Sequence, residues 1–511
     1  MKKILALLLC ALMLVPTFAS CSDNGAEGET TPSAGETPTE IGEPAETKLT
    51  RENTPDNLPD NLNFNDATIN IYHFGSDNTV KYDCVGELVG DGVLDAVYYR
   101  NMAVEDRLGV KLNWIAGPAG WNDFPADVAT ALAAGVSDYD MIVEESSRLF
   151  QQSLQGYYYD LMTLSDYIDL EQPWWYGNMM AEGSIDNSKR YFLNGDLFLT
   201  CMFGASAMYF NKQMFTNNFG DVQELYDKVL DGTWTYDAFA EYCIAVYSDA
   251  NGDSVADPTD IYGFRYSQWG IPNYLSMSTG LTFSKRDEDG YPVLDIYTED
   301  GIKWGETLYR LLYSDNISTE GDPQQTFIAQ SSLFYPGQFS TAHELRDTEF
   351  EYGIVPYPKL KEELNYMSAA GTVNGNGGAI PVAAPAEKIQ ATCAVMEALC
   401  AESYRTVVPE WYESALKMKY SDGLIDAQMV DIIYENINSS FIMMADKALG
   451  LGSIFTYAVF GAGNDGAFAS YYEANKKSYD KALKDCIQDY KDLDLQKVAD
   501  TEASAETVAA E

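Results

Sequence analysis

The stretch ATINIYHF, residues 67–74, alternates apolar and polar side chains and is rich in β-branched residues. This pattern predicts a half-buried strand. In the residues that follow, Leu94, Val97, Val104 and Leu108 fall on one helical face, and Gly109 is placed to cap the end of that helix. We therefore expect a strand followed by an amphipathic helix.

The same alternation continues along the chain. VKLNWI (110–115) predicts a second strand, DVATALAAG (127–135) a short helix, and YDMIV (139–143) a buried strand. Strands that alternate with helices are typical of a parallel α/β sheet. Further on, RYFLNGDLFLT (190–200) predicts a hairpin with its turn at Asn194 and Gly195, and EYGIVPYPKL (351–360) predicts a strand that ends in prolines.

The N-terminus has the three parts of an export signal over residues 1–20: two lysines, an apolar run, and small residues before Cys21. The run is shorter than the roughly 20 residues that a membrane-spanning helix needs. The pattern resembles a bacterial lipoprotein signal, although Phe18 stands where that signal usually has Leu. This resemblance implies that Cys21 is lipidated; the alternative is ordinary secretion with an incidental cysteine. Residues 21–63 are acidic and rich in Pro and Thr, so we expect a disordered tether there.

Composition narrows the function. The chain has 511 residues, which is more than one hydrophobic core normally supports, so two lobes are expected. A formal net charge of −46 argues against nucleic acid and polyanionic ligands. With two histidines and no G-x-S-x-G, P-loop or H-E-x-x-H motif, the sequence offers little basis for catalysis, and we expect no enzyme.

Several phrases along the body resemble the extracellular solute-binding proteins of carbohydrate ABC transporters, family 1, of the type found in gut Firmicutes. The phrases are VEDRLGVKL (104–112), LEQPWWYGNM (170–179), LNGDLFL (193–199), YFNKQMF (209–215), DGTWTYDAF (231–239), YGIVPYPKL (352–360) and AESYRTVVPEWYESALKMKY (401–420). They are spread over nearly the whole body.

The resemblance implies an α/β, two-lobed periplasmic-binding-protein-like (type II) fold with hinge-crossing segments and a ligand cleft. By analogy, lobe 1 comprises 66–203 with 378–440, lobe 2 comprises 204–372 with 445–495, and 496–511 is a disordered tail. Such a protein is a monomer, lipid-anchored to the outer face of the cell membrane. It captures a carbohydrate, here expected to be an oligosaccharide, and delivers it to ABC transporter permease subunits without a required cofactor.

Sugars present a face of C–H groups and a rim of hydroxyls, so a receptor needs flat aromatics and planar polar groups. In open α/β sheets, ligands lie at the carboxyl ends of strands. Candidate ligand-binding residues at strand ends or in loops are therefore His73, Asp77, Trp121, Asp123, Glu144, Glu145, Trp269, Tyr335, Gln338, Trp411 and Tyr412. For each aromatic the alternative is core packing, and for each polar residue it is a solvated loop.

DANGDSVADPTD (249–260) places oxygen-bearing groups at positions 1, 3, 5, 7, 9 and 12 of a loop like that of an EF-hand. The candidate ligands of a structural calcium ion are Asp249, Asn251, Asp253, the Val255 carbonyl, Asp257 and Asp260. Two departures weaken the pattern: Ser254 replaces the usual Gly, and Asp260 replaces the usual Glu. The alternative is an acidic turn.

Two other functional classes stay open at this point. A surface glycoside hydrolase or lyase would need two well-placed carboxylates in a cleft. A receptor for a peptide or another non-sugar solute would have the same fold, since a fold does not determine its ligand.

Overall fold

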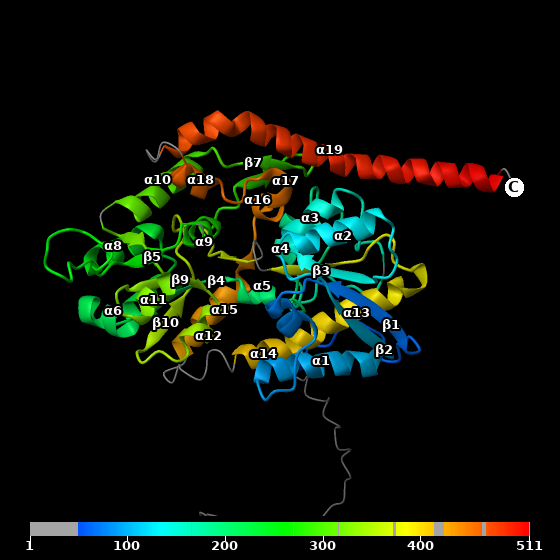
Figure 1. Ribbon diagram of the computed structural model, residues 1–511, viewed down its shortest axis with the longest axis horizontal. Coiled ribbons are helices and arrows are strands. Elements are labelled where there is room, and N and C mark those ends of the chain that lie inside the picture. Colours follow the sequence, from blue (N-terminus) through cyan, green and yellow to red (C-terminus); the bar gives the residue numbers. More distant parts are fainter. Residues whose placement is uncertain are drawn as a thin grey trace, which may run out of the picture. The chain divides into compact units, whose positions relative to one another are not determined.

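The computed structural model describes residues 50–164, 166–268, 270–314, 316–370, 375–412, 424–461 and 467–509 (Figure 1). The predicted signal, Cys21 and the tether up to residue 49 lie outside these ranges, as does Trp269. In the ranges described, no helix combines the length and apolar character of a membrane span.

The first sheet has the strand order β12-β3-β1-β2. Its strands are β1 (Ala67–His73), β2 (Val110–Ala116), β3 (Met141–Glu145) and β12 (Asn376–Ala379). β1 pairs in parallel with β2 and β3, as the alternating strands and helices predict, and β12 joins β3 antiparallel. The helix α1 (Gly92–Leu108) ends at Gly109, whose φ of 57° is the left-handed conformation expected of a glycine cap.

Helices cover both faces of this sheet (Figure 1). α1 and α13 (Ile389–Glu402) pack together on one face, and α2 (Asp123–Ala133) and α3 (Ser146–Ser153) lie on the other. Ile69, Ile71, Met141, Ile142 and Val143 are fully buried between these layers, because a sheet covered on both faces needs apolar side chains on both.

The second sheet is antiparallel with the order β10-β4-β9. Its strands are β4 (Ser206–Asn211), β9 (Phe334–Gln338) and β10 (Tyr352–Val355). α8 (Tyr236–Val246) begins at Thr235, which caps it through the Ala238 amide. Trp234 is fully buried, and its indole N–H donates to the Pro356 carbonyl at 2.9 Å.

The remaining elements are mostly helical, and the longest of them is α19. They are η1 (Arg51–Asn53), η2 (Thr79–Cys84), α4 (Gly177–Glu182), α5 (Leu199–Phe203), α6 (Lys212–Phe219), α7 (Gln223–Leu230), β5 (Phe264–Tyr266), α9 (Ile271–Met277), β6 (Ser284–Arg286), β7 (Pro292–Leu294), α10 (Glu299–Tyr313), β8 (Ser318–Glu320), α11 (Pro323–Ile328), α12 (Thr341–Leu345), β11 (Ser368–Ala369), η3 (Ala386–Lys388), η4 (Ser403–Val407), α14 (Val408–Trp411), α15 (Leu424–Glu435), β13 (Ile437–Asn438), α16 (Phe441–Met444), α17 (Asp446–Leu449), α18 (Ile454–Phe460) and α19 (Phe468–Ala509).

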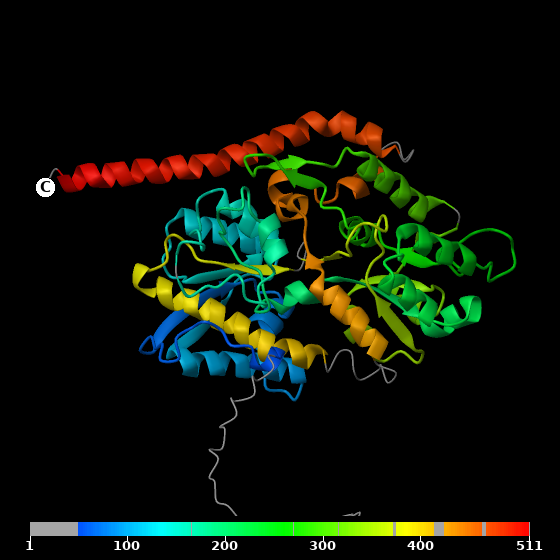
Figure 2. The same cartoon turned by 180° about the vertical axis from the view of Figure 1, so that it is seen from behind.

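The two sheets are the centres of two lobes, and the chain passes between them more than once (Figures 1 and 2). α5 leads from the first lobe into β4 of the second. β11 and β13 form a parallel two-stranded ladder in the crossing region. The hairpin expected at 190–200 is absent: Gly195 forms a bridge with Trp175, Leu193 forms one with Gly378, and α5 follows. Long-range pairing replaces the local turn that the Asn-Gly pair predicts.

The lobe boundaries differ from the expected ones in two places. α15 lies within 378–440, expected in lobe 1, yet it packs on β10 of the second sheet. There Asp426 accepts hydrogen bonds from Tyr226 and Lys212. α17 lies within 445–495, expected in lobe 2, yet it packs on α3 of the first lobe. Amphipathic patterns show that a helix is half-buried, but they do not say which sheet covers it.

Both ends of the body are also more ordered than expected. Residues 50–63 were assigned to the tether, but Leu58 is buried in the core and Asp56 forms an ion pair with Arg107 at 2.6 Å. The expected disordered tail after residue 495 is instead the continuation of α19 to Ala509. Its residues are rich in Ala and Glu, which favour helix.

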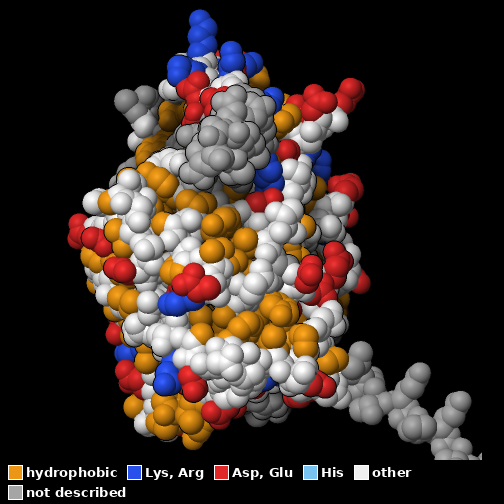
Figure 3. All heavy atoms as spheres, turned by 90° about the vertical axis from the view of Figure 1, so that its right-hand side faces the viewer, with side chains coloured by type: hydrophobic (Ala, Val, Ile, Leu, Met, Phe, Trp, Pro, Cys, Tyr) orange, Lys and Arg blue, Asp and Glu red, His pale blue; other side chains and the backbone are white. Residues whose placement is uncertain are grey.

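The surface of the first-lobe side carries acidic side chains spread over the face (Figure 3). The six cysteines in the described ranges are all buried. Burial raises the pKa of the Cys84 thiol, so it behaves as a small apolar group.

Glu397 of α13 organises the buried tryptophans of the first lobe. Its two carboxylate oxygens accept hydrogen bonds from the indole N–H groups of Trp174 and Trp175, each at 3.1 Å, and the Asp169 amide adds a third. Both tryptophans are buried.

We expect Glu397→Ala to lower the free energy of unfolding by about 3 kcal/mol, because it leaves two buried indole donors without an acceptor. Chemical denaturation measures this change. Glu387→Ala, at an exposed position just before α13, is the control and should be nearly neutral. Equal stability of the two variants would contradict the role given to Glu397.

Several buried carboxyl groups hold protons more tightly than usual, among them Glu397, Asp83 and Asp196. Burial raises the pKa of Glu397 to about 7, and it raises the pKa of Asp83 and of Asp196 to about 6. In each case the folded state binds a proton that the unfolded chain, with ordinary carboxyl pKa values near 4, has already released. Their contribution to stability is therefore present below about pH 4 and is lost as the pH rises through 6 to 7.

We accordingly expect a higher melting temperature at pH 5 than at pH 8, measured by calorimetry at constant ionic strength. The difference between the two pH values should shrink in Glu397→Gln, which keeps an acceptor but does not titrate. An undiminished difference in this variant would show that Glu397 does not contribute to the pH dependence.

Candidate functional site

A pocket of about 210 Å³ opens where elements of both lobes meet. It is lined by Phe74, Ser76, Asp77, Asn78, Thr79, Trp121, Thr200, Phe203, Gly204, Gln338, Ser340 and Asn376. The first six come from the loops after β1 and β2 and from the start of η2. Thr200 to Gly204 belong to α5 and the crossing that follows it, Gln338 and Ser340 to the end of β9, and Asn376 to the start of β12. The pocket therefore lies at strand ends, where the sequence predicts the ligand site.

Five of the predicted ligand residues come together here. Asp77, Trp121 and Gln338 line the pocket. Glu144 and Glu145, at the end of β3, line an adjoining hollow of about 10 Å³, which shares the rings of Phe74 and Trp121 with the larger pocket. A hollow of this size holds about one water molecule.

Trp121 is the most accessible aromatic ring of the pocket. Its side chain is 46% exposed, and one side of the ring lies against Phe74 at a centroid distance of 5.2 Å. The Phe203 ring packs against Trp411 at a centroid distance of 5.8 Å and against Tyr82 at a centroid distance of 4.8 Å. The pocket thus offers the accessible ring of Trp121, backed by packed aromatic side chains. Its lining contains no Lys or Arg among the described residues.

Glu144 and Glu145 are nearly inaccessible to solvent. Glu144 accepts a hydrogen bond from Gln152 at 2.9 Å through one oxygen, while its other oxygen, Oε1, has no partner among the described residues. Burial raises the Glu144 pKa to about 8, and burial also raises the pKa of Glu145, which accepts from Ser147. With a pKa of about 8, the Glu144 carboxyl is protonated at neutral pH and can donate a hydrogen bond.

The predictions missed the group that shapes the pocket floor. Asp83 of η2 accepts hydrogen bonds from the Thr200 amide at 2.9 Å, from the Thr200 hydroxyl at 2.6 Å and from Asn376 at 2.7 Å. Asn376 also donates to the Thr79 hydroxyl at 2.9 Å. These are small polar residues far apart in the chain, and no local pattern in the sequence marks them as neighbours.

The other predicted site residues lie elsewhere. His73 is buried, with one ring nitrogen 3.0 Å from the Phe74 carbonyl, and burial lowers its pKa. Asp123 is exposed at the start of α2 but does not line the pocket. Tyr335 packs on Tyr209 and Phe327.

Trp411 and Tyr412 also lie off the pocket, and Trp269 is outside the described residues. Trp411 is buried between Phe203 and Phe339, because α14 supports the crossing region from behind. Tyr412 lies edge-to-face against Tyr434.

The acidic loop 249–260 folds around its own amides. Asp249 accepts from the amides of Gly252 and Ser254, and the buried Asp260 accepts from Tyr247 and from the amides of Ala250 and Asp257. Within the described part of the chain, no three His, Cys, Asp or Glu side chains converge on a point that would hold a metal ion. In this conformation Asp249 accepts hydrogen bonds from the loop's own amides, and calcium binding by the loop stays a prediction.

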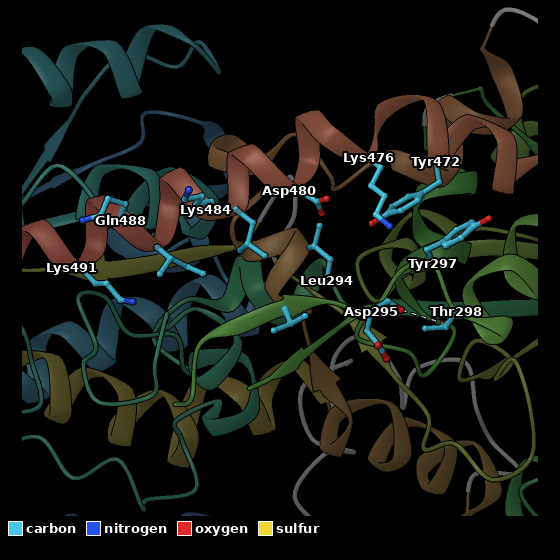
Figure 4. Close-up of a pocket in the computed structure, with 13 residues that line it drawn as sticks. Leu294, Asp295, Tyr297, Thr298, Tyr472, Lys476, Asp480, Lys484, Gln488 and Lys491 are labelled. Carbon is cyan, nitrogen blue, oxygen red and sulfur yellow. Dashed lines mark hydrogen bonds between the residues drawn. The ribbon is translucent and has the colours of Figure 1, made fainter. Parts of the chain in front are cut away.

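A second pocket, of about 490 Å³, lies between α19 and residues 293–298 (Figure 4). At one end Tyr297 and Tyr472 stack with centroids 5.2 Å apart. Its walls alternate lysines with Asp295 and Asp480, and none of them comes from the ends of the two main sheets. We regard it as the seam along which α19 packs on the body.

No protein-family model matches the chain, and no curated protein matches it either. Solved structures do. The sugar-binding protein MalE from Xanthomonas citri has a TM-score of 0.55 at 12% identity. The match covers 83% of this chain and 99% of the MalE chain. The galacto-N-biose-/lacto-N-biose I-binding protein of the ABC transporter from Bifidobacterium longum has a TM-score of 0.54 at 12% identity, with coverage of 83% and 98%.

A third similar structure is the ABC transporter associated binding protein from B. animalis subsp. lactis, with a TM-score of 0.51 at 15% identity and coverage of 82% and 99%. Similarity at this level of identity shows the fold. The chain has the two-lobed α/β fold of MalE-like periplasmic binding proteins.

Proposed function

We propose that the protein is the substrate-binding component of an ABC transporter and that it captures a neutral carbohydrate in the pocket between its lobes. One observation carries this proposal. The pocket joins a half-exposed tryptophan to a rim of hydroxyl and amide groups with one carboxylate, Asp77, and no Lys or Arg lines it in the described residues.

The chemistry of the pocket suits a sugar. The C–H face of a pyranose stacks on a flat aromatic ring, for which Trp121 is available. Sugar hydroxyls act as both donors and acceptors, and the side chains of Ser76, Asn78, Gln338 and Ser340 can match them. Glu144 adds a carboxyl oxygen with no partner in the hollow beside Trp121.

The solved structures support a sugar of this kind. The Bifidobacterium longum protein is described in complex with lacto-N-biose, the B. animalis protein in complex with β-1,6-galactobiose, and Thermotoga maritima MalE3 with maltose. All three ligands are neutral disaccharides. For this chain we propose a neutral oligosaccharide.

The cellular setting belongs to the same proposal. The lipoprotein-like signal supports attachment of Cys21 to a lipid on the outer face of the cell membrane, and the acidic linker would hold the monomeric body away from that membrane. Delivery of the sugar to permease subunits follows from this role. The phrases quoted above support assignment to the solute-binding family 1 of gut Firmicutes.

We expect Trp121→Ala to weaken sugar binding about tenfold or more, because a lost stacking interaction of ~1.4 kcal/mol corresponds to one decade in Kd. A thermal-shift screen of neutral oligosaccharides identifies the ligand, and isothermal titration calorimetry then compares the variants. Tyr99→Ala is the control, because Tyr99 is 58% exposed on α1 and does not line the pocket.

If Trp121→Ala bound the sugar with unchanged affinity, the ligand would have to bind outside this pocket. The same incubations, analysed for new reducing ends or unsaturated sugars, test the enzymatic alternative. We expect the sugar to be recovered unaltered. Its cleavage would show that the protein is a hydrolase or lyase and would contradict the proposed function.

For the loop 249–260 we propose that it binds a calcium ion, which draws the carboxylates away from the loop amides. The expected result is a rise in melting temperature on adding millimolar CaCl₂ to EDTA-treated protein, because a ligand that binds only the folded state stabilises it. Asp253→Asn should abolish the rise. An equal rise in both proteins, or none in either, would leave the loop an acidic turn.

A further inference from the structure

We propose that residues 50–58 act as a strap that docks on the body and restrains the relative movement of the two lobes, with Arg51 as its anchoring side chain. This segment contacts α1 and η4 of the first lobe and α15, which packs on the second sheet. The proposal does not depend on the nature of the ligand.

Arg51 is inserted into an aromatic cage. Its guanidinium carbon lies 4.2 Å from the ring centroid of Tyr404, 4.9 Å from that of Tyr434 and 5.9 Å from that of Tyr412. It donates a hydrogen bond to the Tyr434 hydroxyl at 3.3 Å. Three rings around one guanidinium are a recognition site for a cation, with each ring face attracting the positive charge.

A buried carboxylate completes the cage. The side chain of Asp196 is fully buried, and one of its oxygens is 4.0 Å from the Arg51 guanidinium. Asp196 also accepts hydrogen bonds from Tyr176 at 2.8 Å and from Tyr434 at 2.9 Å. A buried acid beside a cation favours the occupied cage over an empty one, since the empty cage would leave the acid without a nearby positive charge.

The rest of the strap docks on the first lobe alone. Asp56 accepts two hydrogen bonds from Arg107 of α1, both at 2.6 Å, and one from Arg405 of η4 at 3.2 Å. Arg405 also donates to the Thr54 carbonyl, and the Leu58 side chain is buried in the core. The segment is therefore fixed at several points, and Arg51 is its outermost.

The cage combines residues from both lobes. Asp196 lies in the first lobe three residues before α5, which leads across to β4. Tyr434 lies near the end of α15, which packs on β10 of the second sheet and runs into the crossing strand β13. The Tyr434–Asp196 hydrogen bond thus joins the lobes beside the crossing region, and the Arg51 guanidinium covers it. Separating the lobes at this point requires Arg51 to leave.

The test compares Arg51→Ala, Arg51→Lys and Asp56→Asn in the full chain. Spin labels on Lys111→Cys in β2 and Glu306→Cys in α10 report the distance between the lobes by pulsed electron paramagnetic resonance, because both positions are exposed and the six native cysteines of the described ranges are buried. Hydrogen exchange of residues 50–58 reports docking of the strap, and Lys285→Ala, an exposed ion-pair variant, is the control.

We expect Arg51→Ala to broaden or shift the distance distribution and to lower the melting temperature by several degrees. Arg51→Lys, which keeps the charge in the cage, should change both the distance distribution and the melting temperature less than Arg51→Ala does. Asp56→Asn, whose partners all belong to the first lobe, should lower the melting temperature but leave the distances unchanged.

An unaltered distance distribution in Arg51→Ala, with increased exchange of residues 50–58, would overturn the proposal. So would equal broadening in Arg51→Ala and Asp56→Asn, because the cage would then have no special role. If Arg51→Ala does not fold, Arg51→Lys and Tyr434→Phe give the same comparison, since both keep the volume of the cage.

Discussion

The carboxylate of Asp83 is the interaction on which the pocket depends. It is buried, and it joins three segments that are distant in the chain: the turn after β1, the helix α5 at the first crossing, and the start of β12 at the return. Thr79, Thr200 and Asn376, which it orients directly or through one hydrogen bond, all line the pocket. Burying this carboxylate without these donors would cost several kcal/mol, so pocket and crossing segments must form together.

This constraint links the pocket to movement. Because the same residues belong to the crossing segments and to the pocket wall, a rotation of one lobe changes the shape of the pocket, and a ligand that contacts both walls favours one arrangement. The Arg51 cage lies at a different point of the same region, where Tyr434 and Asp196 meet. Two polar clusters therefore hold the crossing region: one lines the pocket, and the other contacts Arg51 of the 50–58 strap.

The sequence predicts the parallel sheet of the first lobe well, because the period-two pattern of 67–74 and the cap at Gly109 are local signals. It also predicts which strand ends and loops reach the pocket, including Trp121 and Gln338. It does not predict the fate of Asn194 and Gly195, whose turn tendency is overridden by pairing with distant strands. Nor does it predict Asp83 or Arg51, whose partners lie 117 to 383 residues away. Local patterns identify elements, whereas the polar contacts between them depend on the tertiary fold.

The helix α19 touches both lobes. Near its start Phe468 stacks on Phe455 of α18, in the second lobe, and Tyr472 stacks on Tyr297. About five turns after Tyr472, Tyr490 donates to Asp186 at 2.6 Å, and Leu493 lies against Gly156, with both partners in the first lobe. Because α19 is a continuous helix fixed at one point on each lobe, it should allow the lobes to twist about the helix axis more readily than it allows them to open at the hinge. The two lobes should therefore open less widely than the crossing segments alone would allow.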